Sequence, residues 1–443
     1  MDVDAITGEL ERSAARAVEI ASKLGADQSE AAASYGEGLS VTVRMGELES
    51  VERQKDRSLG VTVYRKRCKG NASTGDFSAA GIEAAVGKAM SIASFTAVDE
   101  YAGLADAALM AVDPPDLDLY HPWELDVETA TELALNCENA ARAVDSRIAN
   151  SEGATTTSNA GSSAYANSHG FTGVFPTSSH SMSAIVVAGQ NGALERDHWY
   201  SAARSAEGLE APERIGELAA TRALRRLDSR QLATRSVPVI FPAELARGLF
   251  GHLIAAIRGT SQYRKASFLL DSRGKRIFSE LVDIVEDPLI PGAMASAPFD
   301  GEGVATAKRK LVEDGILNGY VLSSYSARRL GLVTTGNAGG IHNLIVAPTA
   351  GPLESMIADC GQAFLVGELL GQGVNIVTGD YSRGAAGFWI ENGEIAHAVS
   401  EVTVAGNLAD MFERIQAIGS DVDARGAIRC GSVLIDELTI AGQ

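Results

Sequence analysis

The sequence has few cysteines and no closely spaced cysteine pair. Four thiols are spread over 443 residues, and no C-x-x-C motif occurs. Disulfide frameworks and zinc-ribbon sites both require cysteines at short, regular spacings, so the sequence predicts neither. We expect free thiols, as in a reduced cytosolic protein, at Cys68, Cys137, Cys360 and Cys430.

Long hydrophobic runs are also missing. The longest wholly apolar runs, such as residues 184–189, fall far short of the roughly 20 residues needed to cross a bilayer. The amino-terminal stretch MDVDAITGELE is acidic, whereas a secretion signal begins basic and then turns apolar. We therefore expect no membrane association, no export and a cytoplasmic location.

Basic side chains are outnumbered. The chain has 38 Lys and Arg against 57 Asp and Glu, a formal net charge of −19. Such a surface repels phosphate backbones and anionic lipids, which makes nucleic acid an unexpected partner. Hydrophobic residues make up 45% of the chain, enough for the two or three cores that its length suggests.

The common catalytic signatures are absent. The sequence has no G-x-S-x-G elbow, no phosphate-binding G-x-x-x-x-G-K-[ST] loop and no complete G-x-G-x-x-G. No two of the seven histidines lie within five residues of each other, which excludes a local zinc site but not one assembled from distant residues. His252 shares a predicted helix face with Leu245, Leu249 and Ala256, which favours a core or interface histidine.

The elements that remain indicate an α+β fold. A helix is expected over residues 3–24, followed by an antiparallel meander with turns at residues 45–46 and 58–60. A second helix follows Ser78, a good N-cap residue. Residues 1–112 are thus predicted to form an N-terminal α+β domain.

The stretch DPPDLDLYHP, residues 113–122, indicates a domain boundary because proline and aspartate disfavour both helix and sheet. A helix of about 18 residues is expected from Asp126, then hairpins of small side chains with a turn at residues 191–192. A charged helix over residues 212–227 ends the predicted central domain, residues 113–230.

Residues 231–443 are predicted to form a mainly β domain with helices around Gly248 and over residues 352–360. Asp314-Gly315 and Asn392-Gly393 each separate two apolar runs, which predicts two hairpins with type I′ turns. Its densest glycine and polar clusters are TTGNAGGIHNL and NIVTGDYSRGAAGFWIENG. Because glycines let a ligand approach the backbone, we predict substrate-binding residues here, and an extended peptide could pair with a strand edge. The residues are Asn337, Gly339, Gly340, His342, Asp380, Tyr381 and Arg383.

Several long motifs resemble one known family. TTGNAGGIHNL, VNIVTGDYSRGAAGFWIENGEI, VSEVTVAGNLADM and RCGSVLIDELTIAGQ are similar to the PmbA/TldE side of the TldD/PmbA family, and SLGVTVYRKRCKGNASTGDFS to its first domain. The resemblance implies a cytosolic metalloprotease of two related subunits that trims or degrades unfolded peptides, such as leader peptides and labile antitoxins. The TldD-like subunit carries zinc on a helix with H-E-x-x-x-H, plus a cysteine near its C-terminus.

The zinc helix of that family falls here on GLFGHLIAAIRG, when the two subunit types are matched through residues 278–281. On that register the two ligands and the base would be Phe250, Gly251 and Ala255, none of which binds metal or accepts a proton. His252 lies out of register, and Cys430 lies inside the closing strand. The resemblance therefore implies no metal ligands, no catalytic residues and no cofactor in this chain, with zinc in a TldD-like partner.

The sequence leaves three alternative hypotheses for the function of this chain. The first is a non-zinc partner subunit that shapes the substrate chamber of a TldD-like protease; the sequence leaves open whether the isolated chain forms a homodimer. The second is a stand-alone peptide-binding scaffold. The third is a hydrolase without metal that uses a nucleophile such as Ser382, which has no histidine nearby in sequence.

Overall fold

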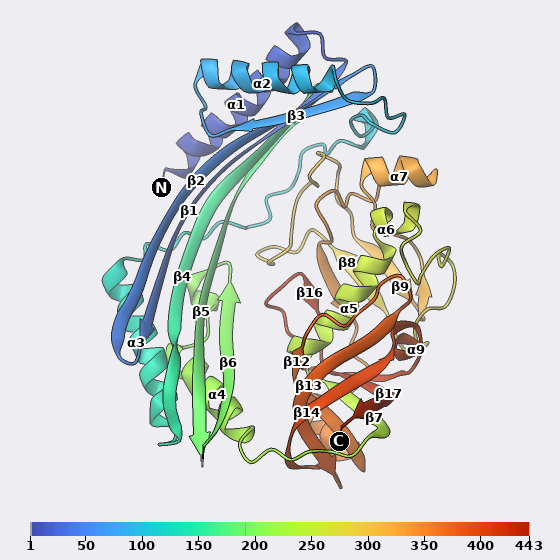
Figure 1. The fold of residues 1–443 in the computed structure, drawn as a ribbon. Helices are drawn as coiled ribbons and strands as arrows, with labels where there is room; N and C mark the ends of the chain where they lie inside the picture. The colour runs from blue at the N-terminus through green and yellow to red at the C-terminus, as the bar shows by residue number, and fades with distance from the viewer. Residues whose placement is uncertain (1, 191, 443) are drawn as a thin grey trace.

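The computed structural model describes residues 2–190 and 192–442 and consists of two lobes (Figure 1). The first lobe is one antiparallel sheet in the order β3-β2-β1-β4-β5-β6. Its strands are β1 (Gln28–Arg44), β2 (Glu47–Arg65), β3 (Cys68–Thr74), β4 (Ile148–Asn167), β5 (Thr172–Gln190) and β6 (Ala193–Ala203).

Four helices cover a single face of this sheet. Their alanine-rich sides pack on alternate strand residues, with Leu10 of α1 against Leu59 and Ile215 of α4 against Met182 in the same buried clusters. The opposite, concave face is turned toward the second lobe (Figure 1). The helices are α1 (Val3–Lys23), α2 (Ala79–Ala93), α3 (Val127–Ala143) and α4 (Pro212–Arg225).

The sheet of the first lobe runs through both of the first two predicted domains. Strand β1 pairs with β4 from Glu30↔Asn167 to Val43↔Ala154, so residues from either side of position 112 share one hydrogen-bonded ladder. The boundaries at residues 112 and 230 stay predictions. The helices expected after Ser78 and Asp126 are confirmed, and both side chains cap their helix by accepting a backbone N–H.

The second lobe contains a closed ring of strands. The order β14-β13-β12-β7-β17 is completed by pairing of β14 with the end of β17, while β15 pairs with the beginning of β17. These strands are β7 (Arg235–Phe241), β12 (Gln362–Leu370), β13 (Asp380–Glu391), β14 (Glu394–Asn407), β15 (Ile415–Ile418) and β17 (Val433–Ala441).

A smaller sheet with the order β10-β9-β8-β11-β16 completes this lobe. Its strands are β8 (Ile284–Asp287), β9 (Arg309–Glu313), β10 (Ile316–Leu317), β11 (Asn343–Val346) and β16 (Ile428–Arg429). The helices are α5 (Ala243–Ile257), α6 (Gly259–Tyr263), α7 (Ser324–Leu330), α8 (Leu353–Asp359) and α9 (Leu408–Glu413), and short 3₁₀ turns occur at Ala107–Leu109 and Ala206–Gly208.

The α+β class and the β-rich second lobe are confirmed. Asp314-Gly315 and Asn392-Gly393 form the two expected turns, and all four residues have positive φ angles between 48° and 81°. The turn predicted at residues 58–60 is wrong, because β2 continues through it. The turn predicted at residues 191–192 begins outside the described residues. Among those described, no helix has both the length and the apolar composition needed to cross a membrane.

Candidate functional site

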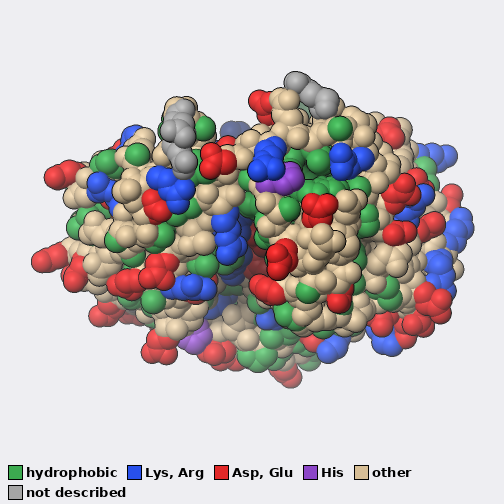
Figure 2. All heavy atoms as spheres, turned by 90° about the horizontal axis from the view of Figure 1, so that it is seen from below, with side chains coloured by type: hydrophobic (Ala, Val, Ile, Leu, Met, Phe, Trp, Pro, Cys, Tyr) green, Lys and Arg blue, Asp and Glu red, His purple; other side chains and the backbone are tan. Residues whose placement is uncertain are grey.

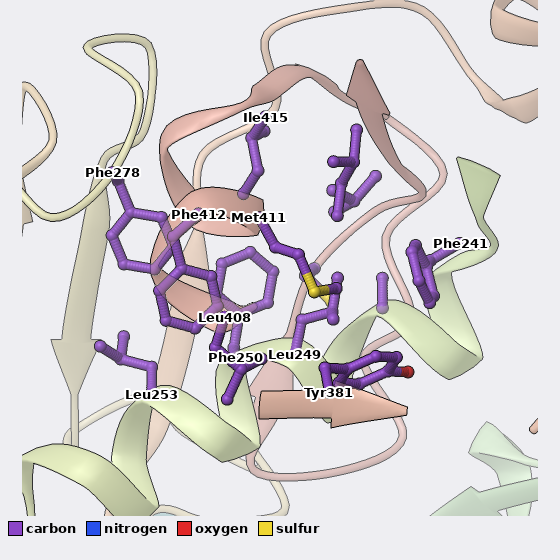
Figure 3. Close-up of a cluster of buried hydrophobic side chains, with 14 of the residues drawn as sticks. Phe241, Leu249, Phe250, Leu253, Phe278, Tyr381, Leu408, Met411, Phe412 and Ile415 are labelled. Carbon is purple, nitrogen blue, oxygen red and sulfur yellow. The ribbon is translucent and has the colours of Figure 1, made fainter. Parts of the chain in front are cut away.

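Helix α5 belongs to the second lobe. It packs on the hydrophobic core of that lobe, and its first turn borders the space between the two lobes. It starts after Pro242, which suits a helix start because its missing N–H needs no partner there. Phe250 is 0% exposed, and its ring centroid lies 6.2 Å from that of Phe278, which stacks on Phe412 at 4.4 Å. Figure 3 shows the Phe250 ring among these packed side chains. Phe250 is matched to a metal-binding position of the family's zinc helix, and here its side chain is part of the hydrophobic core.

The partly accessible face of α5 carries Gly251, His252 and Ala255. Glycine and alanine offer no donor atom to a metal. The His252 ring lies edge-on to Tyr381, with centroids 6.1 Å apart. Burial, and then the positive charge of Arg383, lowers the pKa of His252, which keeps the imidazole neutral near pH 7.

The donor set at this helix does not fit a zinc ion. Within residues 2–190 and 192–442, no three His, Cys, Asp or Glu side chains lie close enough together to hold a metal. Cys430 is fully buried and its Sγ lies 3.8 Å from the Ala243 carbonyl oxygen. Burial raises the pKa of this thiol to about 12, whereas a zinc ligand must be a thiolate.

Four of the predicted substrate-binding residues lie in the loop that precedes β11. The Asn337 amide donates to Glu286 Oε1 at 2.7 Å and accepts from Arg309 Nη2 at 3.0 Å. The His342 backbone N–H donates to the same Glu286 oxygen at 2.8 Å. Gly339 and Gly340 have φ angles of 109° and 140°, which favour glycine. The polar side chains of this loop therefore hold the loop in place.

This loop forms one wall of a cavity of about 630 Å³ between the lobes. Gly339, Gly340 and His342 line it, and the facing wall is the concave side of the first sheet. Most side chains on that wall are small, and two are aromatic. The sheet residues are Ala32, Ala33, Ser34, Ser58, Gly60, Ser163, Ala164, Tyr165 and Phe175. A cavity of this size and mostly apolar lining is typical of a ligand pocket.

The other three predicted residues lie elsewhere, on β13. Tyr381 and Arg383 face α5 rather than the cavity, and exposed Asp380 accepts a hydrogen bond from Thr378 Oγ1 at 2.6 Å. The structure therefore divides the seven residues between two places. Whether any of the seven binds substrate stays a prediction.

Pairing of a peptide with β13 is excluded by the neighbouring strands. Strand β13 pairs with β14 along its whole length and with β12 from Gly384 to Glu391. Its first residues are covered by the preceding loop, where Ser382 N donates to Gly373 O at 2.7 Å. The strand-addition hypothesis at this strand is therefore wrong. No hydrogen bond joins the exposed Ser382 hydroxyl to a histidine anywhere in the described residues.

A set of ion pairs between the lobes was not foreseen from the sequence. Arg222 Nη1 lies 2.7 Å from Glu244 Oε1, and Arg226 Nη2 lies 2.5 Å from Glu368 Oε2, each pair joining α4 or its end to the second lobe. They border a pocket of about 470 Å³ beside the first turn of α5. Figure 2 shows basic and acidic side chains on both sides of the hollow between the lobes. No local sequence pattern marks them, since each partner lies on a different element.

Asp300 supplies a pH-dependent prediction at the cavity wall. Burial raises its pKa to about 6, against 3.8 ordinarily, although backbone N–H groups of Ala338, Glu302 and Val304 donate to it. Between about pH 4 and pH 6, Asp300 is therefore protonated in the folded state and ionised in the unfolded state. This contribution to stability is present below pH 4 and is lost as pH rises through 6, by up to about 3 kcal/mol.

The measurement is urea unfolding from pH 4 to 7 for the parent and for Asp300→Asn. We expect the parent-minus-variant difference in unfolding free energy to fall across this range, because the amide does not titrate. Two parallel pH profiles would contradict the assignment of that proton to Asp300.

Comparison with known proteins gives a family for the whole chain. Family models described as PmbA/TldA metallopeptidase domain 1, central domain and C-terminal domain match residues 29–93, 120–227 and 234–442. The chain is 48% identical to Metalloprotease PmbA of Escherichia coli O157:H7 over 434 residues, which cover 98% of this chain and 96% of that one.

Two solved structures share the fold. A Bacteroides thetaiotaomicron protein, described as a candidate modulator of DNA gyrase, superposes with a TM-score of 0.94 at 26% identity and covers 99% of this chain and 100% of that one. TldE from Thermococcus kodakarensis gives a TM-score of 0.81 at 21% identity, with 96% and 99% covered, and so supports the fold alone.

Proposed function

The chain belongs to the PmbA/TldA metallopeptidase family, and we propose that it acts there as the subunit without zinc. In this proposal it pairs with a TldD-like, zinc-bearing subunit in the cytoplasm. The complex trims or degrades unfolded peptides, such as leader peptides and antitoxins. The membership in a peptidase family rests on the matches over nearly the full chain; the partner, the substrates and the location are proposals.

The observation that carries the proposal is the composition of α5. Where a zinc helix needs two imidazoles and a carboxylate, this helix has Phe250 in the core and Gly251 and Ala255 on its accessible face. A general base must lie within hydrogen-bond reach of the water it activates, and a hydrocarbon cannot serve. In this proposal the helix is retained for packing, and the zinc chemistry comes from another chain.

The chain would contribute the enclosing walls of the complex. The cavity between the lobes is lined mainly by backbone and small side chains. Such walls admit an extended chain but exclude a folded domain, which accounts for a preference for unfolded peptides. These walls also contact few side chains of the peptide, which makes cleavage tolerant of the peptide sequence.

The test is a peptidase assay on an unstructured peptide with this chain alone, with a TldD-like protein, and with both. We expect no cleavage by the chain alone and chelator-sensitive cleavage by the mixture. A matched control uses a TldD-like protein whose motif glutamate is replaced by glutamine, which should bind this chain but not cleave.

Robust cleavage by the isolated chain would contradict the proposal. Loss of that cleavage in Ser382→Ala would then favour a hydrolase without metal. Recovery of the chain from its native cell with bound peptides and no zinc-bearing homologue would favour a stand-alone scaffold.

A further inference from the structure

One segment of the second lobe is strongly basic, although the chain as a whole is acidic. Residues 258–276 carry six basic side chains and one acidic side chain, a formal charge of +5, whereas the whole chain carries −19. All seven of these side chains are exposed to solvent. They are Arg258, Arg264, Lys265, Asp271, Arg273, Lys275 and Arg276. Such a segment attracts anionic ligands that the rest of the molecule repels.

The first three of these basic residues surround the short helix α6. Arg258 comes directly before the helix, and Arg264 and Lys265 come directly after it. Arg329 of α7 joins them, because its guanidinium carbon lies 5.0 Å from the centroid of the Tyr263 ring and that of Arg264 lies 5.8 Å from the same centroid. Figure 1 shows α6 and α7 side by side at one end of the second lobe. We call Arg258, Arg264, Lys265 and Arg329 the basic surface.

Aromatic rings hold part of the basic surface in an ordered position. The Arg329 guanidinium lies over the ring of Tyr101, 4.8 Å from its centroid, as well as over that of Tyr263. Stacking restricts a guanidinium that would otherwise move freely, so less conformational entropy is lost when it binds a ligand. The neighbouring Arg328 donates to three backbone carbonyls, among them Tyr101 O at 2.8 Å, and adds a further positive charge.

The carboxylates on the neighbouring segments do not cancel this charge. Asp99 and Glu302 each accept one hydrogen bond from α7, at 2.8 and 2.9 Å, and Glu100 is exposed. The basic surface and Arg328 together provide five cationic side chains against these three carboxylates. The surface therefore retains an excess of positive charge for an anionic ligand.

The basic surface begins beside the cavity of about 630 Å³ between the lobes. Gly339 and Gly340 line this cavity, and Arg258 Nη2 lies 3.7 Å from the position that a Cβ on Gly340 would take. The cavity wall is mostly neutral, and Asp300 is the only carboxylate among its described lining residues. A peptide that leaves the cavity past Gly340 therefore meets cationic side chains.

We propose that the basic surface binds acidic side chains of a substrate peptide, in the part of the peptide that extends from the cavity. That the ligand is a peptide rests on the proposed function. A guanidinium donates to both oxygens of a carboxylate, which makes arginine a good partner for Asp and Glu. The acidic remainder of the chain repels the same side chains, so the basic surface fixes which part of the peptide lies outside the cavity. The substrate class is thus an unfolded peptide with acidic residues beside the segment that enters the cavity.

The test measures binding of fluorescent, unstructured peptides to the isolated full chain by fluorescence anisotropy. One peptide joins a segment of small neutral residues to a block of glutamates, and its counterpart has glutamines in place of the glutamates. We expect the glutamate peptide to bind roughly 10-fold more tightly at low salt, because several exposed ion pairs form together. The preference should fall to roughly 2-fold at about 0.5 M salt, where charges are screened over a few ångströms.

A double variant, Arg264→Gln with Lys265→Gln, should lose most of the preference for the glutamate peptide. Both residues are exposed, so the fold should be unaffected, and circular dichroism checks this. The matched control is Arg53→Gln with Lys55→Gln, which removes the same charge from exposed positions of β2 that do not line the cavity. The control variant should keep the full preference, because its charges are remote from the basic surface.

Equal binding of the glutamate and glutamine peptides to the parent chain overturns the proposal, whatever the variants do. A full preference in the Arg264/Lys265 double variant overturns it as well. Two further results would assign the surface to another partner and so also overturn it. One is a homodimer in sedimentation that only this double variant dissociates, and the other is an oligothymidylate that binds more tightly than the glutamate peptide.

The outcome is separable from that of the proposed function, because this assay needs no zinc subunit. A chain that prefers the glutamate peptide but never activates a TldD-like protein retains the basic surface as a peptide site and loses the partner role. A chain that activates its partner but binds both peptides equally retains the partner role and loses the peptide site.

Discussion

Replacing Phe250 by alanine is expected to lower the unfolding free energy by about 3–5 kcal/mol, as for other large aromatic side chains removed from a core. The side chain is fully buried and packs with Phe278, Leu408 and Phe412 in the main cluster of the second lobe. Alanine would leave a cavity that the surrounding helix and strands cannot close. Chemical unfolding followed by circular dichroism measures the change.

Gly251→Ala is the matched control at the next residue. A Cβ there would lie 4.0 Å from Ile428 Cδ1, an ordinary contact, and alanine favours helix over glycine by up to about 1 kcal/mol. We therefore expect opposite signs at adjacent positions of one helix. A loss of less than about 1 kcal/mol for Phe250→Ala would contradict the view that this helix serves packing.

Removing Arg309 is expected to be as damaging, for an electrostatic reason. Glu286 is 1% exposed, and Arg309 Nε donates to it at 2.7 Å while its other nitrogens reach Tyr320 O and Asn337 Oδ1. In Arg309→Met the carboxylate stays buried without its cation, which costs about 3–5 kcal/mol. Urea unfolding of the parent and of the variant at pH 7 measures the loss.

Arg414→Met is the control for Arg309, because its ion pair with Glu437 is exposed. Exposed pairs contribute about 0–1 kcal/mol to the unfolding free energy. Equal losses for the two variants would contradict the structural role given to the Glu286 network, and with it the statement that Asn337 and His342 are held by that network.

Local turn chemistry decided which hairpins the sequence could predict. Asp-Gly and Asn-Gly tolerate positive φ at both central positions, and the two hairpins so marked are present. The turn that follows β2 is made instead by Lys66 and Arg67, with φ angles of 50° and 63°. Neither residue type indicates such a conformation. The sequence predicts a turn at Gly60, but this residue pairs with Ala32 on one side and Ser73 on the other and so belongs to the strand.

Long-range pairing explains what was missed at the candidate site. The loop around Asn337 was found from its glycines, but its dependence on Glu286 and Arg309 comes from contacts between separate elements. Likewise, Tyr381 meets His252 only because α5 packs against β13. The sheet that joins β1 to β4 also depends on strands far apart in the chain. A single sequence carries little information on such contacts.

The measurement that tests the central claim most directly is the zinc content of the purified chain and of its complex with a TldD-like protein. We expect no stoichiometric zinc on this chain alone and about one zinc per pair of subunits in the complex, because α5 offers no set of donors that fits the ion. About one tightly bound zinc per isolated chain, lost when His252 or Cys430 is replaced, would contradict the account.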